Sequence, residues 1–142
     1  MTHTVSQQFA AKLNQLYPML DFVREGMAEM GFNATDLQRF EIAVEEAVVN
    51  IIHHAYPNKE GFIEITLNLF PKEKMQVVIK DQGIPFNPLL QDPAFDYETP
   101  PEERKPGGLG IPFIREFIDQ IEYQRENIFN VLLLEKSASK LL

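Results

Sequence analysis

The sequence contains no cysteine, no tryptophan and no long run of apolar residues. Without cysteine the chain has no thiolate to offer as a nucleophile, a metal ligand or half of a disulfide. No apolar segment approaches the roughly 20 residues that a membrane-spanning helix needs. The first eight residues are polar and lack the basic-then-apolar pattern of a secretory signal. We therefore expect an unprocessed protein of the cytoplasm that makes no membrane contact.

Basic residues are also scarce, since 13 Lys and Arg stand against 21 Asp and Glu, for a formal net charge of -8. Such a surface repels the phosphate backbone of nucleic acids, so direct nucleic-acid binding is not expected. Apolar residues are plentiful, at 44% of the chain, and are sufficient to form a buried core. The length of 142 residues predicts a single domain over 1–142.

Periodic apolar residues predict three helices and five strands. Helical spacing covers 13–27, 36–55 and 111–118. Alternation of apolar and polar residues predicts strands at 5–9, 62–70, 75–80, 121–125 and 129–136. Thr35 followed by Gln38 predicts a capping box at the start of the second helix. The order of elements favours an α+β fold, a two-layer sandwich with helices on one face of a mixed, mainly antiparallel sheet.

The second helix carries two polar side chains on one flank. Glu46 and Asn50 lie four residues apart, which places them about 40° apart around the helix axis, next to the small residues Ala43 and Ala47. The amide oxygen of Asn50 can ligate a hard cation, and the carboxylate of Glu46 can accept a proton from a hydroxyl group. A solvated helix edge is the alternative explanation for the same two residues.

Two further clusters flank a stretch of about 25 residues that is rich in proline and is predicted to form a mobile lid. Asp81 and Gly83 follow a strand directly, where a carboxylate can accept a hydrogen bond from an exocyclic amine and a glycine permits close approach. Ordinary turns contain the same pattern. The glycine-rich segment 107–110 leads into the third helix, whose N-terminal N–H groups favour a phosphate, although many such segments are only structural.

Taken in order, Glu-x-x-x-Asn on a helix, Asp-x-Gly after a strand and Gly-x-Gly opening a helix resemble the GHKL ATPase superfamily. The segments Glu-Ala-Val-Val-Asn-Ile-Ile-His-His-Ala-Tyr and Asp-Gln-Gly-Ile-Pro-Phe-Asn-Pro look most like the anti-sigma-factor serine/threonine kinases of bacterial partner-switching systems. The resemblance covers nearly the whole chain. It implies an ATP-binding anti-sigma regulatory factor that phosphorylates an anti-anti-sigma antagonist protein and so controls a sigma factor or similar regulator.

The resemblance also implies roles for individual residues. Asn50 would hold Mg²⁺, Glu46 would be the catalytic base, and Asp81 would bind the amino group of adenine. The other contacts to ATP would come from Gly83, Arg104, Lys105, Gly108, Leu109 and Gly110. A packing role is expected for His54, and solvent exposure for His53.

Two positions depart from the pattern of the family. Pro85 stands where a second glycine is common, a variant of the anti-sigma branch that should preserve nucleotide binding. In the last hairpin, many members have a threonine that supports the adenine contact. Our approximate register places Phe129 at that position, with Asn130 beside it, which predicts a weaker contact to the base.

The sequence leaves two other functions open. A kinase-inactive member of the family would bind ATP and act by sequestering its partner, whereas a non-nucleotide interaction module would use its glycines only to cap a helix. Retained ATP binding with lost phosphotransfer in Glu46→Ala would identify the kinase, and stabilisation by Mg-ATP would exclude the interaction module. Family likeness further suggests a homodimer, with the first helix near Met19 and Phe22 as its candidate surface.

Overall fold

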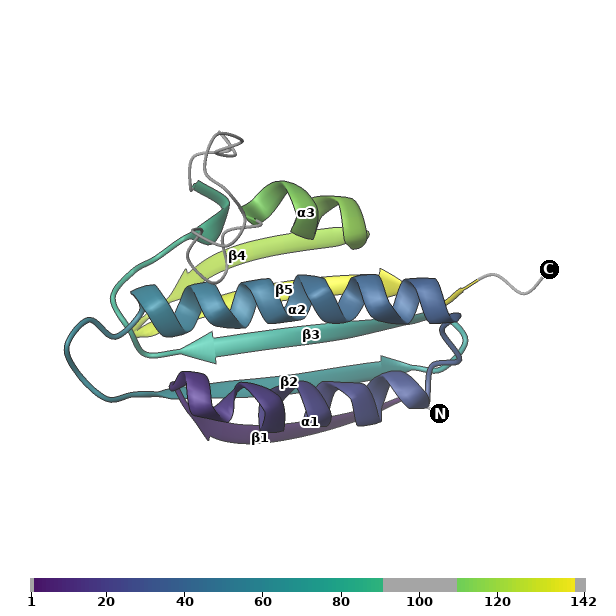
Figure 1. The fold of residues 1–142 in the computed structure, drawn as a ribbon, viewed down its shortest axis with the longest axis horizontal. Helices are drawn as coiled ribbons and strands as arrows, with labels where there is room; N and C mark the ends of the chain where they lie inside the picture. The colour runs from purple at the N-terminus through teal and green to yellow at the C-terminus, as the bar shows by residue number, and fades with distance from the viewer. Residues whose placement is uncertain (1, 91–109, 140–142) are drawn as a thin grey trace.

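The computed structural model describes residues 2–90 and 110–139, and within these ranges helices lie over a sheet (Figure 1). The helices are α1 (Leu16–Ala28), α2 (Ala34–His54) and α3 (Gly110–Phe117), with 3-10 turns η1 (Leu13–Gln15) and η2 (Pro88–Leu90). The strands are β1 (His3–Ala10), β2 (Phe62–Phe70), β3 (Lys74–Asp81), β4 (Gln120–Glu126) and β5 (Phe129–Ser137). The predicted α+β sandwich is confirmed.

The five strands form one sheet in the order β1-β2-β3-β5-β4. Each neighbouring pair is antiparallel, so the described part of the sheet is fully antiparallel where the sequence predicted a mixed, mainly antiparallel one. Because β5 lies between β3 and β4, the first residues of β5 come to lie beside the last residues of β3. Asp81 thereby pairs with Asn130.

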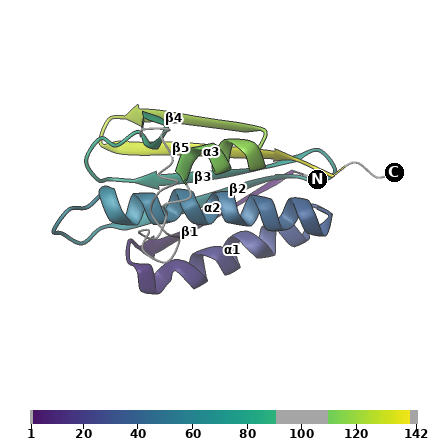
Figure 2. The same cartoon turned by 45° about the horizontal axis from the view of Figure 1, so that its top comes forward.

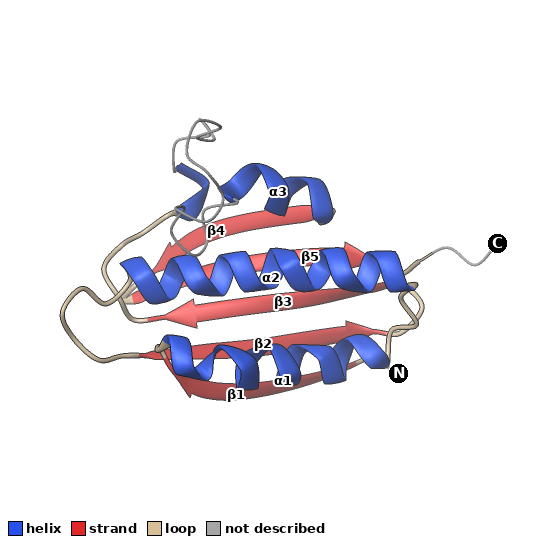
Figure 3. Ribbon diagram, viewed as in Figure 1, coloured by secondary structure: helices blue, strands red, loops and turns tan. Residues whose placement is uncertain are grey.

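The helices lie over one face of the sheet, as Figures 2 and 3 show, and the core lies between the two layers. Alternate residues of β2, among them Ile63, Ile65 and Leu67, are fully buried and point toward the helices. Phe40 and Val44 on α2 cover them from the other side. Each such side chain contributes about 1.5–3 kcal/mol when it leaves water. No helix of the described ranges combines the length and apolarity that a bilayer crossing requires.

The start of α2 differs from the predicted capping box at Thr35. The cap is Asn33, whose side chain accepts a hydrogen bond from the backbone N–H of Asp36 at 2.8 Å. Ser139 reinforces this turn, because its hydroxyl donates to the Asp36 carboxylate at 2.8 Å. Gly31 has φ +70° between the two helices, as expected for a glycine that ends a helix.

The predicted dimer surface on α1 is not exposed. Met19 is fully buried, and Phe22 packs edge-on against Phe9 with ring centroids 5.9 Å apart. The large apolar residue of α1 that does face solvent is Tyr17, at 73% exposure. The apolar stripe of α1 is wider than the sequence suggested, because it covers both β1 and β2.

Candidate functional site

One flank of α2 faces α3. The guanidinium group of Arg39 lies over the ring of Phe117 on α3, 5.6 Å from its centroid. Glu46 follows Arg39 by seven residues, or about two turns, and Asn50 comes one turn later, so all three lie along the same flank. Glu46 is 7% exposed, whereas Asn50 is half-buried. The two α2 side chains predicted to act together therefore do share a flank, and that flank is covered rather than solvated at Glu46.

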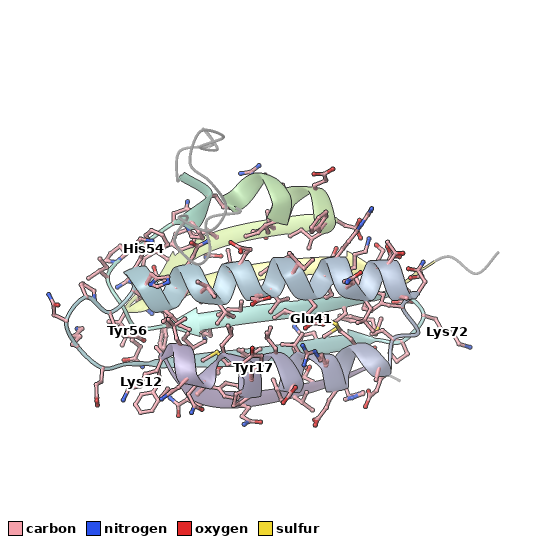
Figure 4. The ribbon with its side chains drawn as sticks, viewed as in Figure 1. Lys12, Tyr17, Glu41, His54, Tyr56 and Lys72 are labelled. Carbon is pink, nitrogen blue, oxygen red and sulfur yellow. The ribbon has the colours of Figure 1, made fainter. Side chains whose placement is uncertain are left out.

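The flank ends at His54, which Figure 4 shows at the C-terminal end of α2. Its ring stacks on that of Phe86, with centroids 4.8 Å apart and planes 23° apart. This contact joins the helix to the loop after β3 and agrees with the packing role expected for His54. His53 is exposed, also as expected.

Backbone contacts fix the same loop beneath the end of α2. The N–H of Ile84 donates to the carbonyl oxygen of Ala55 at 2.9 Å. A Cβ atom added to Gly83 would lie 2.2 Å from that oxygen, closer than any real contact. The close approach that requires glycine here is thus to the backbone of α2 itself, which the sequence had assigned to the nucleotide base.

Asp81 is the buried carboxylate of the site, at 3% exposure. Its Oδ1 accepts hydrogen bonds from the N–H of Gly83 at 2.9 Å and from Nδ2 of Asn130 at 2.8 Å. Burial raises the pKa of Asp81 above its usual range, while these two hydrogen bonds and the charge of Arg125 oppose the rise. Both protein donors use the same oxygen.

Asn130, rather than Phe129, is the residue of the last hairpin beside Asp81. The β3–β5 register pairs Asp81 with Asn130 directly. Phe129 points to the other face of the sheet, where the ammonium group of Lys80 lies 4.8 Å from its ring centroid. The signal in the sequence was the alternation of β5, since Leu132 is buried beneath the helices and Asn130 shares its side of the strand.

Sequence reasoning missed two more residues that hold this end of the site together. The hydroxyl of Tyr56 donates to the carbonyl oxygen of Phe62 at 2.6 Å and accepts from the N–H of Gln82 at 2.7 Å. Arg125 donates to the carbonyl oxygen of Gly83 at 2.9 Å. Alternation along β4 could have indicated the second, because it places Arg125 on the same side as the apolar residues of that strand.

The remaining predicted residues belong to the segment before α3. Arg104, Lys105, Gly108 and Leu109 lie outside the described residues, as does most of the predicted lid. Gly110 is the first residue of α3. The described structure therefore places the α2 flank, with Glu46 and Asn50, next to what we call the base end of the site: Asp81, Asn130 and loop 82–86.

A cavity of about 450 Å³ lies beside this end of the sheet. Its lining includes Lys12, Tyr56, Glu64, Lys80 and Phe129, together with Asp81 and Gln82. Neither Glu46 nor Asn50 contributes to it. The cavity therefore adjoins the base end of the site through Asp81 and Gln82, but it does not include these two α2 residues.

Comparison with known proteins identifies relatives by sequence. The chain is 31% identical over 107 residues to the "Serine-protein kinase RsbW" of Bacillus mycoides (strain KBAB4), and 30% identical to the protein of that name in Bacillus cereus (strain Q1). The matched region is 73% of this chain and spans 66% of the length of either relative.

A solved structure shares the fold. The RsbU and RsbW domains of Rv1364c from Mycobacterium tuberculosis superpose with a TM-score of 0.68 over 98% of this chain and 33% of that one, at 16% identity. The family model described as the histidine kinase-like ATPase domain matches residues 9–136. That match includes both ends of the site described above. The chain belongs to the histidine kinase-like ATPase domain family, as the order of its three motifs predicted.

Proposed function

We propose that this chain is an ATP-binding anti-sigma regulatory factor with serine/threonine protein kinase activity toward an anti-anti-sigma protein. The family and the names of the Bacillus relatives support this class of activity. The observation that carries the proposal is a buried hydrogen-bond acceptor, Asp81, held beneath the end of the helix that bears Glu46 and Asn50. A sigma factor or similar regulator is the second partner, and both partners are bound in the cytoplasm.

The base end suits an adenine ring. The hydrogen bonds that Asp81 accepts from residues 2–90 and 110–139 end on Oδ1, so that Oδ2 can accept a hydrogen bond from an exocyclic amine. A hydrogen bond to a charged acceptor contributes about 1.5–3 kcal/mol. Adenine presents such an amine at position 6, where a 6-oxo purine bound in the same orientation presents an acceptor that Asp81 would repel. With the base in that orientation, Asp81 favours ATP over the 6-oxo purine triphosphates.

The α2 flank suits a metal–phosphate group. Mg²⁺ in nucleotide sites keeps water and phosphate oxygens and needs only one or two protein ligands. Asn50 supplies an amide oxygen. Among residues 2–90 and 110–139, no group of three or more His, Asp or Glu side chains converges to form a metal site of its own. Bound Mg²⁺ would offset the charge of the triphosphate. We assign Arg104, Lys105, Gly108, Leu109 and Gly110 to the phosphates.

Glu46 is the proposed base. It lies one turn before Asn50 on the same flank, so a substrate hydroxyl directed at the terminal phosphate would approach its carboxylate. Accepting the proton of that hydroxyl contributes about 10²–10⁴-fold to such a reaction. Phosphoryl transfer otherwise depends on positioning and charge stabilisation, which the rest of the site provides.

Phosphotransfer to a purified anti-anti-sigma protein tests the proposal, with ATP binding measured in parallel by calorimetry. Glu46→Gln should lower the transfer rate about 10²–10⁴-fold and leave the dissociation constant for Mg-ATP unchanged. Glu45→Gln is the matched control, because it removes the neighbouring carboxylate from another side of the helix. Equal transfer by both variants would exclude Glu46 as the base, and an absence of wild-type transfer with intact ATP binding would favour a partner that acts by sequestration.

A further inference from the structure

Asn130 is the most fully bonded side chain of the base end. Its Nδ2 donates to Oδ1 of Asp81 and to the carbonyl oxygen of Ile84, both at 2.8 Å. Its Oδ1 accepts from the N–H of Phe86 at 3.2 Å and from the hydroxyl of Tyr123. A side-chain amide has two donor hydrogens and two acceptor positions. All four are used, on three different segments of the chain, so the amide has one orientation only.

That orientation determines what Asp81 can do. The backbone N–H of Phe86 can only donate, so it fixes the amide oxygen toward the loop and the amide NH₂ toward Asp81. An NH₂ group can only donate, and it therefore favours the ionised carboxylate over the carboxylic acid. Asn130 is itself 4% exposed, so this donor lies inside the protein.

We propose that Asn130 is a positioning residue that holds Asp81 as an ionised acceptor and thereby sets the preference of the site for a 6-amino purine over a 6-oxo purine. This inference rests on the proposed ATP-binding function. It assigns the selectivity to two residues: Asp81 contacts the base, and Asn130 acts through Asp81.

Other charged or titratable groups around Asp81 do not replace this effect. The charge of Arg125 on β4 opposes the rise that burial causes in the pKa of Asp81. Burial also raises the pKa of Tyr56 after α2, and the charge of Asp81 adds to that rise. His54 stacks on Phe86 of the loop after β3. Tyr123 reaches Asp81 only through the amide of Asn130. Burial opposes ionisation throughout, so losing the Asn130 donor raises the pKa of Asp81 further.

The test measures the affinities for Mg-ATP and Mg-inosine triphosphate by calorimetry between pH 5 and 9. The wild type should prefer ATP by about 10- to 100-fold, the range expected for one hydrogen bond to a charged group. In Asn130→Leu, the loss of ATP affinity on acidification should begin at a higher pH, and the preference should fall toward equality at the acid end. Asn130→Thr, which restores one hydroxyl donor, should return both properties toward the wild type.

Tyr123→Phe is the matched control. It removes a hydrogen bond to Asn130 but leaves Nδ2 facing Asp81, so the base preference and the pH profile should stay close to the wild type. A merely structural role for Asn130 would lower the affinities for both nucleotides equally at every pH. That result in Asn130→Leu, with an unshifted profile, would overturn the proposal.

The carboxyl ¹³C shift of Asp81 gives a second readout that needs no nucleotide. Followed against pH by NMR, its titration should move to higher pH in Asn130→Leu. If Asn130→Leu does not fold, the milder Asn130→Ser should show the same shift. An unmoved titration would contradict the inference even if ATP binds. If the titration moves but the wild type binds no nucleotide, the proposed function fails and the coupling of the two residues stands.

Discussion

Two asparagines on the helix side of the sheet differ in almost every physical respect. Asn130 is 4% exposed and makes four side-chain hydrogen bonds. Asn50 is half-buried on α2, and its side chain has no hydrogen-bond partner among residues 2–90 and 110–139. Asn130 is therefore a residue that the fold requires, whereas the side chain of Asn50 is available to bind a ligand.

The same contrast extends to the two ends of the site. The base end is held in place by its own hydrogen bonds before any ligand arrives, which lowers the entropic cost of recognising a base. On the α2 flank, the half-buried amide of Asn50 is available to the proposed metal–phosphate group. This arrangement suits a nucleotide site in which the protein recognises the base, while the phosphate oxygens of the nucleotide supply most of the coordination of the metal.

Alanine at each asparagine gives the largest contrast. Asn130→Ala should lower the free energy of unfolding by about 3 kcal/mol, because several buried groups lose their partner at once. Asn50→Ala should change it by no more than about 0.5 kcal/mol, since the site is half-exposed and alanine favours a helix. Urea denaturation of the two variants measures both values. Similar losses would show that the two residues have comparable structural roles.

A smaller loss is expected at Gly83. In Gly83→Ala the new methyl group must move the Ala55 carbonyl or the loop, at a cost of about 2 kcal/mol. Because the loop carries the N–H that bonds Asp81, the affinity for ATP should fall as well. Thermal unfolding with and without ATP measures both effects. A stable variant with normal affinity would contradict the tight contact between this loop and α2.

The N-terminal end of α2 provides a control that lowers the stability of the whole protein without changing the site. Asn33→Ala removes the cap and should destabilise the protein by about 1 kcal/mol. The cap lies at the opposite end of the helix from His54, so calorimetry should give an unchanged dissociation constant for Mg-ATP. A matching loss of affinity would mean that the site responds to overall stability and not to its own contacts.

The smallest change in stability is expected at Asp81. Its raised pKa in the folded state means that its contribution to stability is fully present below the unfolded pKa and is lost as the pH rises through the folded value. Asp81→Asn keeps the shape and the acceptor oxygen without the charge. It should therefore raise the unfolding midpoint slightly at pH 7, and the gain should vanish toward pH ~4. Thermal melts across this pH range measure the change in the unfolding midpoint, and a lower midpoint for Asp81→Asn at pH 7 would refute the prediction.

Much of the fold followed from local patterns. Alternation predicted all five strands, and the spacing from Phe40 to Ile51 predicted the long helix, because one buried face imposes one period. The features that failed depended on distant parts of the chain. The cap at Asn33 is reinforced by Ser139, more than a hundred residues away, and the burial of Met19 depends on how far α1 covers the sheet.

The motifs of the site could be predicted from the sequence, but the register in which β5 pairs with β3 was harder to predict. Glu46, Asn50, Asp81 and Gly83 followed from short sequence patterns. The placement of Asn130 opposite Asp81 depends on a two-residue turn between β4 and β5, with φ +56° at Asn127. A shift of one residue there exchanges the two faces of β5, which is why the sequence pointed to the neighbouring residue.

The most direct test of the account is a calorimetric titration of ATP into the wild type and Asn50→Ala, each with Mg²⁺ and with EDTA. We predict that Mg²⁺ strengthens binding to the wild type and that Asn50→Ala loses this gain, at least about 10-fold, the lower range for disturbed metal sites. With EDTA the two proteins should bind ATP equally. If Asn50→Ala binds Mg-ATP as tightly as the wild type, Asn50 is not the metal ligand and the proposed division of the site is wrong.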